Sequence, residues 1–169
     1  MLGPAALFRH ADLMDIAHLA ELFADGVTPL LRTDFTDDDA WERVVAAVAA
    51  PVDFGYDVGD DDLDDDGYTP NLRPISEPAY AGLTGPDIAT AWDVDAVGYV
   101  LLADSVTMAA ARTSGDPTLV YVDLYDEPGR AFRCPVQEVA SIEANLAIAN
   151  MDFEDFAGAV APDGVFRGF

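Results

Sequence analysis

Two continuous apolar runs place the strongest constraint on the fold of this chain. "AVGYVLLA" at 96–103 and "PTLVYVDLY" at 117–125 do not alternate between apolar and polar residues, as a strand with one solvent-exposed face does. Strands with such sequences are covered on both faces, so helices must pack on either side of their sheet. Amphipathic helical patterns occur between the apolar runs, and the sequence therefore predicts an α/β fold.

The helical patterns indicate which segments cover the sheet. At 36–50, "TDDDAWERVVAAVAA" begins with acidic residues, which favour a helix start, and Thr36 is the expected N-cap. Its buried stripe consists of Trp41, Val44, Val45 and Val48. Residues 139–160 carry a longer apolar stripe in steps of three and four. Asn150 and Asp152 mark either a kink in that helix or the start of a second one.

The remaining strands complete a mixed sheet. "PLLRTDF" at 29–35 is a short apolar strand, and "NLRPIS" at 71–76 is expected at the sheet edge because Pro74 cannot donate to a central ladder. After a tight turn at 126–130, "AFRCPV" at 131–136 alternates and is expected to return antiparallel. The predicted fold is α/β, with a mixed, mainly parallel central sheet, an antiparallel C-terminal hairpin strand and flanking helices.

Length and pattern predict a single folded domain with an extension. A chain of 169 residues suits one domain with a proper core. Residues 4–25 read as an amphipathic helix, so we expect a helical extension over 1–27 and one α/β domain over 28–169. Residues 51–70 are rich in Pro, Gly and Asp and are expected to form an acidic loop within that domain.

The charge of the chain excludes some partners and favours another. The chain has 32 acidic residues, eight arginines and no lysine, which gives a net charge of −24. Direct binding to nucleic acid or to an anionic membrane needs clustered positive charge, which this chain lacks. A basic protein would be attracted strongly. The alternative is that the charge only keeps the protein soluble.

Few residue types suited to catalysis remain. Without lysine there is no Schiff-base chemistry and no phosphate-binding lysine, and the two histidines, His10 and His18, lie near the N-terminus. Cys134 falls on an apolar strand face and is expected to be a core thiol. A single cysteine, the lack of a membrane-spanning run and the lack of a secretory signal favour a cytoplasmic protein. These features favour a binding protein over an enzyme and leave catalysis open.

The segment "DVGDDDLDDDGY" at 57–68 is the most acidic part of the chain. Asp62, Asp64, Asp66 and Gly67 match the first half of an EF-hand-like Ca²⁺ loop. The second half fails, because Arg73 stands where a bidentate glutamate is required. Two readings remain besides a calcium site: a solvated loop and a contact surface for a basic partner. The contact surface would consist of Asp60, Asp61, Asp62, Asp64, Asp65 and Asp66.

Four other aspartates suggest an alternative, metal-dependent function. Asp34, Asp104, Asp123 and Asp126 each fall at or just beyond the end of an apolar strand run. Ligands bind at the carboxyl edge of open α/β sheets, where converging carboxylates could hold Mg²⁺. The alternative is that these aspartates cap the helices that begin at this edge.

Two arginines flank the turn at 126–130. Arg130 and Arg133 are expected to pair with Glu127 and Asp126 of the turn, and exposed pairs of this kind contribute little to stability.

The C-terminal third also carries a resemblance. "VYVDLYDEPGRAFRC", "NLAIANMDFEDFAGAV" and "DGVFRGF", together with "PLLRTDFTDDDAWERVV", resemble an uncharacterised family of small acidic actinobacterial proteins, over about residues 28–169. The resemblance implies a compact cytoplasmic α/β domain and assigns no catalytic residue or activity.

Taken as a whole, the sequence favours a non-enzymatic acidic binding protein without a cofactor. An immunity or inhibitor protein that recognises a basic partner is one concrete form of this hypothesis. The alternatives are an enzyme that uses Mg²⁺ or Ca²⁺, and a protein whose charge is only solubilising.

Overall fold

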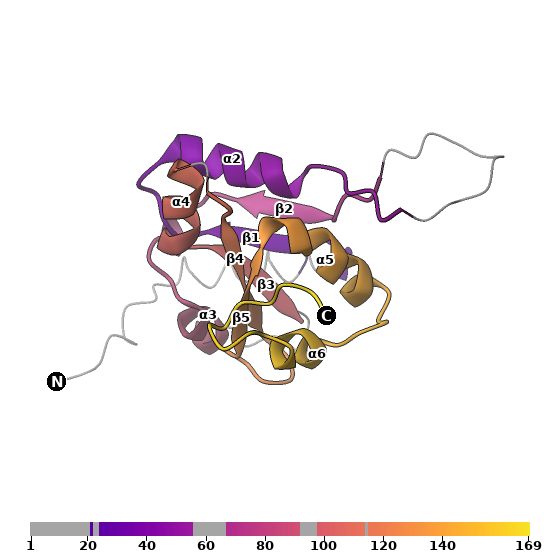
Figure 1. Ribbon diagram of the computed structural model, residues 1–169. Helices are drawn as coiled ribbons and strands as arrows, with labels where there is room; N and C mark the ends of the chain where they lie inside the picture. Colours follow the sequence, from indigo (N-terminus) through magenta and orange to yellow (C-terminus); the bar gives the residue numbers. More distant parts are fainter. Residues whose placement is uncertain (1–20, 22–23, 56–66, 92–97, 114) are drawn as a thin grey trace.

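A single sheet forms the frame of the molecule. The computed structural model describes residues 21, 24–55, 67–91, 98–113 and 115–169. Within them, five strands pair in the order β2-β1-β3-β4-β5 (Figure 1). The strands are β1 (Thr28–Arg32), β2 (Leu72–Ile75), β3 (Tyr99–Ala103), β4 (Thr118–Asp123) and β5 (Ala131–Pro135). All five predicted strands are present, and β2, which contains Pro74, lies at an edge.

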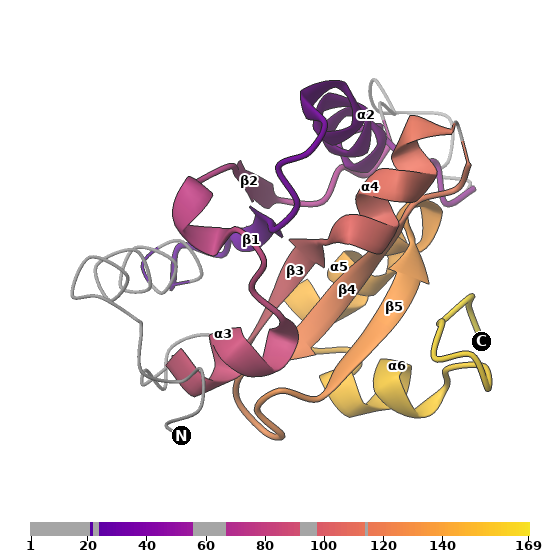
Figure 2. The same cartoon turned by 90° about the vertical axis from the view of Figure 1, so that its left-hand side faces the viewer.

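The helices of the described residues cover the two faces of the sheet unequally. They are α2 (Asp38–Val48), α3 (Gly85–Ala91), α4 (Ser105–Arg112), α5 (Val139–Ala147) and α6 (Phe153–Gly158), with 3₁₀ turns η2 (Pro78–Tyr80) and η3 (Val136–Glu138). α2, α4, α5 and α6 pack with the larger core on one face, and α3 and η2 pack with a smaller core on the other (Figure 2). The predicted α/β architecture is confirmed.

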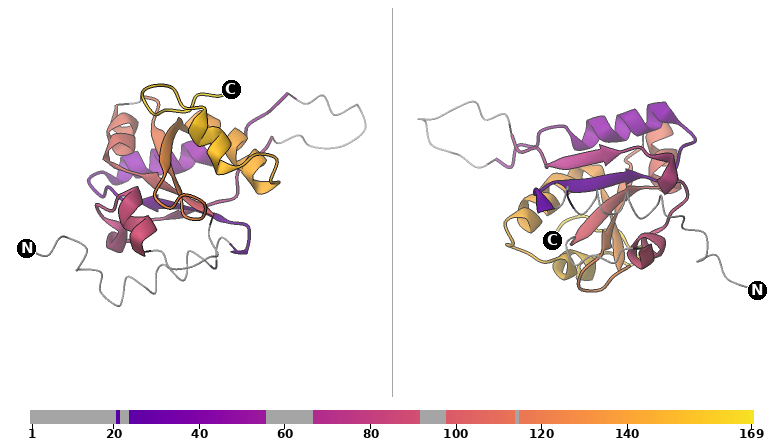
Figure 3. Two further views of the ribbon diagram at one scale, coloured as in Figure 1. Left: turned by 90° about the horizontal axis from the view of Figure 1, so that it is seen from below. Right: turned by 180° about the vertical axis from the view of Figure 1, so that it is seen from behind.

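The direction of the strands differs from the prediction in one respect. β2 and β3 both run parallel to β1, and Figure 3 shows β1 and β2 side by side beneath α2. β4 runs antiparallel to β3 and to β5. The sheet is therefore mixed rather than mainly parallel. After β3, the short helix α4 returns the chain to the edge where β3 ends, and β4 starts there. The Thr107 hydroxyl of α4 donates to the carbonyl of Thr118, the first residue of β4, at 2.6 Å.

Aromatic rings fill the larger core. Tyr121 and Phe132, on adjacent strands, are stacked with ring centroids 5.1 Å apart. Phe153 and Phe156 of α6 lie against Phe132, with centroids at 5.1 and 6.4 Å. Cys134 is fully buried in the same cluster, as the sequence predicts. Because this core fixes α6 against β5, it also fixes the C-terminal segment beyond α6.

Two helix boundaries refine the predictions. The N-cap of α2 is Asp37 rather than Thr36, and its carboxylate accepts the Ala40 N–H at 2.9 Å. The long apolar stripe is divided into two helices, because Asp152 and Asp155 form a capping box that starts α6. Of the two alternatives for this region, a second helix is therefore correct.

Parts of two predicted segments lie outside the described residues. Most of the helix expected over 4–25 is among them, and so is most of the acidic loop expected over 51–70. On either side of residues 56–66, Val52 and Tyr68 form an antiparallel bridge. Among the helices of the described residues, none has the length and apolar character needed to cross a membrane.

Candidate functional site

A pocket of about 720 Å³ opens at the carboxyl ends of the parallel strands β1 and β3. Residues 33–36 follow β1 and residues 82–86 precede or begin α3, and these two stretches line it. Leu102 and Val120 contribute apolar lining from the sheet. The carboxyl edge of an open α/β sheet is the usual place for a ligand, because strand ends and helix starts meet there. The pocket is therefore the first candidate site.

Asp104 links the pocket to the helix that follows β3. It is the N-cap of α4, and its Oδ1 accepts the backbone N–H groups of Val106 and Thr107, each at 3.1 Å. The same carboxylate forms an ion pair with Arg133 of β5, in which both terminal guanidinium nitrogens donate. This pair corrects the prediction that Arg133 binds the turn at 126–130. Arg130 does pair with Glu127, as predicted, at 2.7 Å.

Asp34 supplies a second carboxylate just beyond β1. Its Oδ1 accepts the N–H and the hydroxyl of Thr36 at 2.8 and 2.6 Å. Its Oδ2 lies 3.9 Å from a guanidinium nitrogen of Arg112, whose Nε donates to Asp37 at 3.0 Å. Asp163, a third acidic lining residue, pairs with Arg167 at 2.8 Å.

These contacts keep Asp34 and Asp104 ionised. Hydrogen bonds from Thr36 lower the pKa of Asp34 more than its partial burial raises it. Burial opposes ionisation of Asp104, but hydrogen bonds from Arg133 and Thr107 outweigh it and lower the pKa of that carboxyl. Arg133 is the one cationic side chain among the described residues that line the pocket, and Asp104 already binds it. The lining thus carries three carboxylates and one guanidinium, while Arg112 and Arg167, which are not among the lining residues, lie next to Asp34 and Asp163.

The four aspartates predicted as a metal site do not form one. Asp34 and Asp104 share the carboxyl edge of β1 and β3. Asp123 pairs in register with Tyr99, at the opposite end of β3, because β4 is antiparallel. Its carboxylate accepts backbone N–H groups of the turn that contains Asp126 and so stabilises that turn. Among the described residues, no group of three or more His, Cys, Asp and Glu side chains could hold a metal ion.

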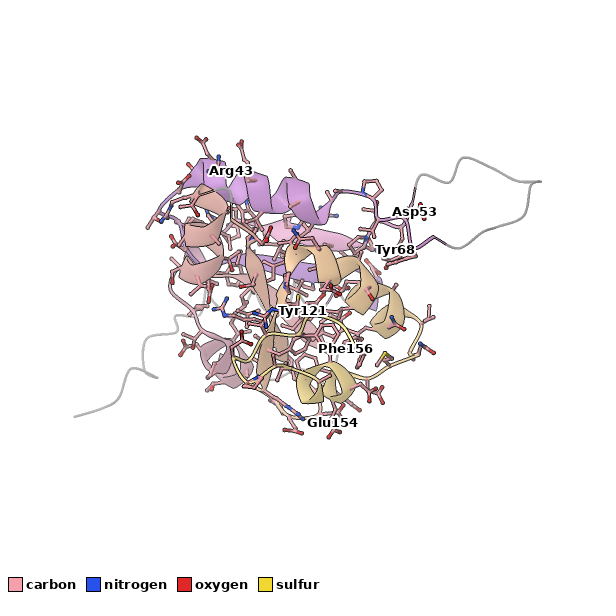
Figure 4. The ribbon with its side chains drawn as sticks, viewed as in Figure 1. Arg43, Asp53, Tyr68, Tyr121, Glu154 and Phe156 are labelled. Carbon is pink, nitrogen blue, oxygen red and sulfur yellow. The ribbon has the colours of Figure 1, made fainter. Side chains whose placement is uncertain are left out.

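The acidic residues predicted to contact a partner lie outside the described residues. These are Asp60, Asp61, Asp62, Asp64, Asp65 and Asp66. Their flanks are described, and Figure 4 shows Asp53 and Tyr68 together at one margin of the fold, where the chain enters and leaves residues 56–66.

A second polar cluster lies within the larger core and was missed by the sequence analysis. Glu143 of α5 is 3% exposed, and three hydroxyl groups donate to its carboxylate. Tyr121 donates to Oε1 at 2.9 Å, while Thr28 and Tyr99 donate to Oε2 at 2.8 and 3.2 Å. The sequence does contain a signal, because Glu143 stands four residues after Val139 and therefore falls on the predicted apolar stripe.

The environment of Glu143 changes the titration of the whole cluster. Burial raises the pKa of Glu143, and the hydrogen bonds from Thr28, Tyr121 and Tyr99 oppose that shift. Burial and the nearby negative charge of Glu143 raise the pKa of Tyr99 and of Tyr121. The tyrosines therefore stay neutral and act as hydrogen-bond donors.

Comparison with known proteins adds a family and no activity. Residues 27–169 match a family described as a domain of unknown function (DUF6924). This match confirms the expected likeness to an uncharacterised family. Neither a curated protein nor a solved structure matches the chain significantly.

Proposed function

The chain belongs to the DUF6924 family of domains of unknown function, and we propose that it is a binding protein that captures a basic protein partner. In this proposal, the partner places an arginine or lysine side chain in the pocket at the carboxyl ends of β1 and β3. An inhibitor that covers the basic surface of its target is one form of such a protein. The observation that carries the proposal is the lining of the pocket, which includes both carboxylates and apolar side chains.

The charges of the pocket favour a cationic occupant. The lowered pKa values of Asp34 and Asp104 mean that both carboxylates are ionised at neutral pH. Oδ1 of Asp34 and Oδ1 of Asp104 each accept at least two hydrogen bonds from the protein. Oδ2 of Asp34, by contrast, lies 3.9 Å from the guanidinium nitrogen of Arg112. Since a carboxylate offers about four acceptor sites, Oδ2 of Asp34 has capacity for a charged donor from a partner.

The shape of the pocket suits a long side chain with a charged end. Leu102, Val120 and Leu83 provide apolar surface that would contact the aliphatic stem of an arginine or lysine. The carboxylates of Asp34 and Asp104 would then meet the charged end. The net charge of −24 would attract a basic protein from a distance and raise its association rate.

A pair of matched peptides tests this proposal. We expect a six-residue arginine peptide to bind at 0.15 M NaCl, and the same peptide with citrulline in place of arginine to bind at least about tenfold more weakly. Citrulline keeps the size of arginine but has no charge. Calorimetric titration measures both affinities, and the salt concentration limits attraction between distant charges, because the Debye length is then about 8 Å.

Matched variants locate the binding site. Asp34→Asn with Asp163→Asn removes two charges from the pocket and should weaken binding of the arginine peptide about tenfold or more. Asparagine is chosen because its oxygen can still accept the local backbone hydrogen bonds. Asp126→Asn with Glu154→Gln changes the net charge equally at exposed positions outside the pocket and should have little effect. Equal losses in the two double variants would show that only the total charge matters and would contradict a binding site in the pocket.

A further inference from the structure

A second cavity, of about 300 Å³, lies at the amino ends of β1 and β3, opposite to the pocket. Thr28 of β1, Tyr99 of β3 and Glu143 of α5 line it, together with Tyr68 and Asn71. Leu146 and Ala147 of α5 add apolar surface. Its volume falls at the lower end of the range for small-molecule sites, about 300–1,000 Å³. The cavity would therefore suit a small ligand.

The charge of the cavity favours a cation. Glu143 is the one charged side chain among its described lining residues, and none of the described arginines forms an ion pair with it. Its three hydrogen bonds come from neutral hydroxyl groups, which stabilise the carboxylate without cancelling its charge. A buried carboxylate that has hydrogen bonds but no cationic partner would attract a cation that enters the cavity.

The hydrogen-bonding capacity of the cavity limits the type of cation. Three of the roughly four acceptor sites of the Glu143 carboxylate are occupied by Thr28, Tyr99 and Tyr121. Asn71 uses its amide nitrogen to bind the Gly26 carbonyl at 2.8 Å, so only its oxygen can accept a further bond. A guanidinium group, with five donors, would leave several of them unsatisfied here. A quaternary ammonium group needs none.

Aromatic rings supply the remaining element of such a site. Tyr68 and Tyr99 both line the cavity, and the hydroxyl of Tyr99 donates to Glu143 at 3.2 Å. Burial, with a smaller contribution from the negative charge of Glu143, raises the pKa of Tyr68. Tyrosine faces attract cations, and cages of aromatic side chains bind quaternary ammonium groups in many proteins.

We propose that this cavity binds a small quaternary ammonium ligand, held by the carboxylate of Glu143 and the rings of Tyr68 and Tyr99. This site is independent of the pocket for a basic partner, since the two share no lining residue.

Choline and its uncharged isostere, 3,3-dimethylbutan-1-ol, test the proposal by calorimetric titration at pH 8. We expect a saturable one-site isotherm for choline and at least tenfold weaker binding of the alcohol, which has the same shape without the charge. Glu143→Gln should weaken choline about tenfold or more and bring its affinity close to that of the alcohol. Equal affinity of the two ligands for the unmodified protein, or no saturable binding of choline up to about 10 mM, would overturn the proposal.

Two substitutions of Tyr68 keep the test valid if Glu143→Gln fails to fold. Tyr68 is only partly buried, so its replacement leaves the core intact. Tyr68→Phe retains the ring and should bind choline nearly as well as the unmodified protein, whereas Tyr68→Leu should bind it several-fold more weakly. Unchanged choline affinity in Tyr68→Leu would contradict an aromatic site.

Discussion

At the scale of single residues, Glu143 is the most unusual feature of the molecule. It occupies a position where the helical pattern calls for an apolar side chain, and it is almost fully buried against the sheet. Thr28, Tyr99 and Tyr121 make this position tolerable because each donates a hydrogen bond to the carboxylate. A residue held in this way links α5 to β1, β3 and β4.

The raised pKa of Glu143 predicts a specific dependence of stability on pH. A carboxyl group whose pKa is higher in the folded state binds more protons there, so it stabilises the fold below its unfolded pKa and loses that contribution as the pH rises through its folded pKa. We therefore expect the unfolding free energy of the unmodified protein, relative to Glu143→Gln, to fall between pH 4.5 and pH 8. Urea denaturation of both proteins across this range measures the difference.

Other acidic groups do not obscure that test. Hydrogen bonds chiefly from Thr36 lower the pKa of Asp34, and those from Thr84 lower the pKa of Asp87. Burial raises the pKa of Asp104, but hydrogen bonds from Arg133 and Thr107 outweigh burial and lower it. Their contributions are lost below about pH 4, outside the chosen window. They are also common to both proteins. A constant difference between the two proteins from pH 4.5 to pH 8 would show that Glu143 does not titrate differently on folding.

At the scale of elements, the break between α5 and α6 decides which part of the apolar stripe is buried. α5 ends at Ala147, Ile148 is 75% exposed and Ala149 has a positive φ of 49°. Asp152 then starts α6 in a new direction and places Phe153 and Phe156 in the core. The stripe is thus interrupted at Ile148 and Ala149, and its two halves pack separately.

Two isoleucines separated by this break should respond differently to truncation. Ile142 is fully buried in the larger core, so Ile142→Ala should destabilise the protein by about 2–5 kcal/mol. Ile148→Ala removes the same atoms from an exposed position and should change the unfolding free energy by less than about 0.5 kcal/mol. Chemical denaturation measures both. Similar losses for the two variants would mean that α5 ends later than described.

The same elements show what could be predicted from the sequence and what could not. Helices and strands follow from local patterns, and therefore all five strands and the edge position of Pro74 were predicted. The direction of β4 depends on where α4 returns the chain, which a local pattern does not contain. The Glu143 cluster escaped prediction because its hydroxyl partners come from residues 28, 99 and 121, far apart in the sequence. Asp34 and Asp104 do follow adjacent strands at one sheet edge, as expected, whereas Asp123 lies at the opposite edge because β4 is antiparallel.

At the scale of the whole molecule, the arrangement of the arginines accentuates the negative surface. Five of the seven described arginines form ion pairs with acidic residues: Arg32, Arg112, Arg130, Arg133 and Arg167. Their charges are thus largely compensated locally. Exposed acidic residues such as Asp39, Glu42 and Glu154 form no ion pair with another described residue. The surface consequently presents negative charge to any approaching protein, which is why we propose a basic partner for the pocket.

The most direct test of this account is to map where a cationic peptide binds. A titration of ¹⁵N-labelled protein with the arginine peptide at 0.15 M NaCl, followed by two-dimensional NMR, reports each backbone amide separately. The account predicts that the largest shifts occur at residues 33–36, 82–85 and 104–105, which line the pocket at the carboxyl ends of β1 and β3. Shifts confined to residues 53–68, or spread evenly over acidic positions, would contradict it.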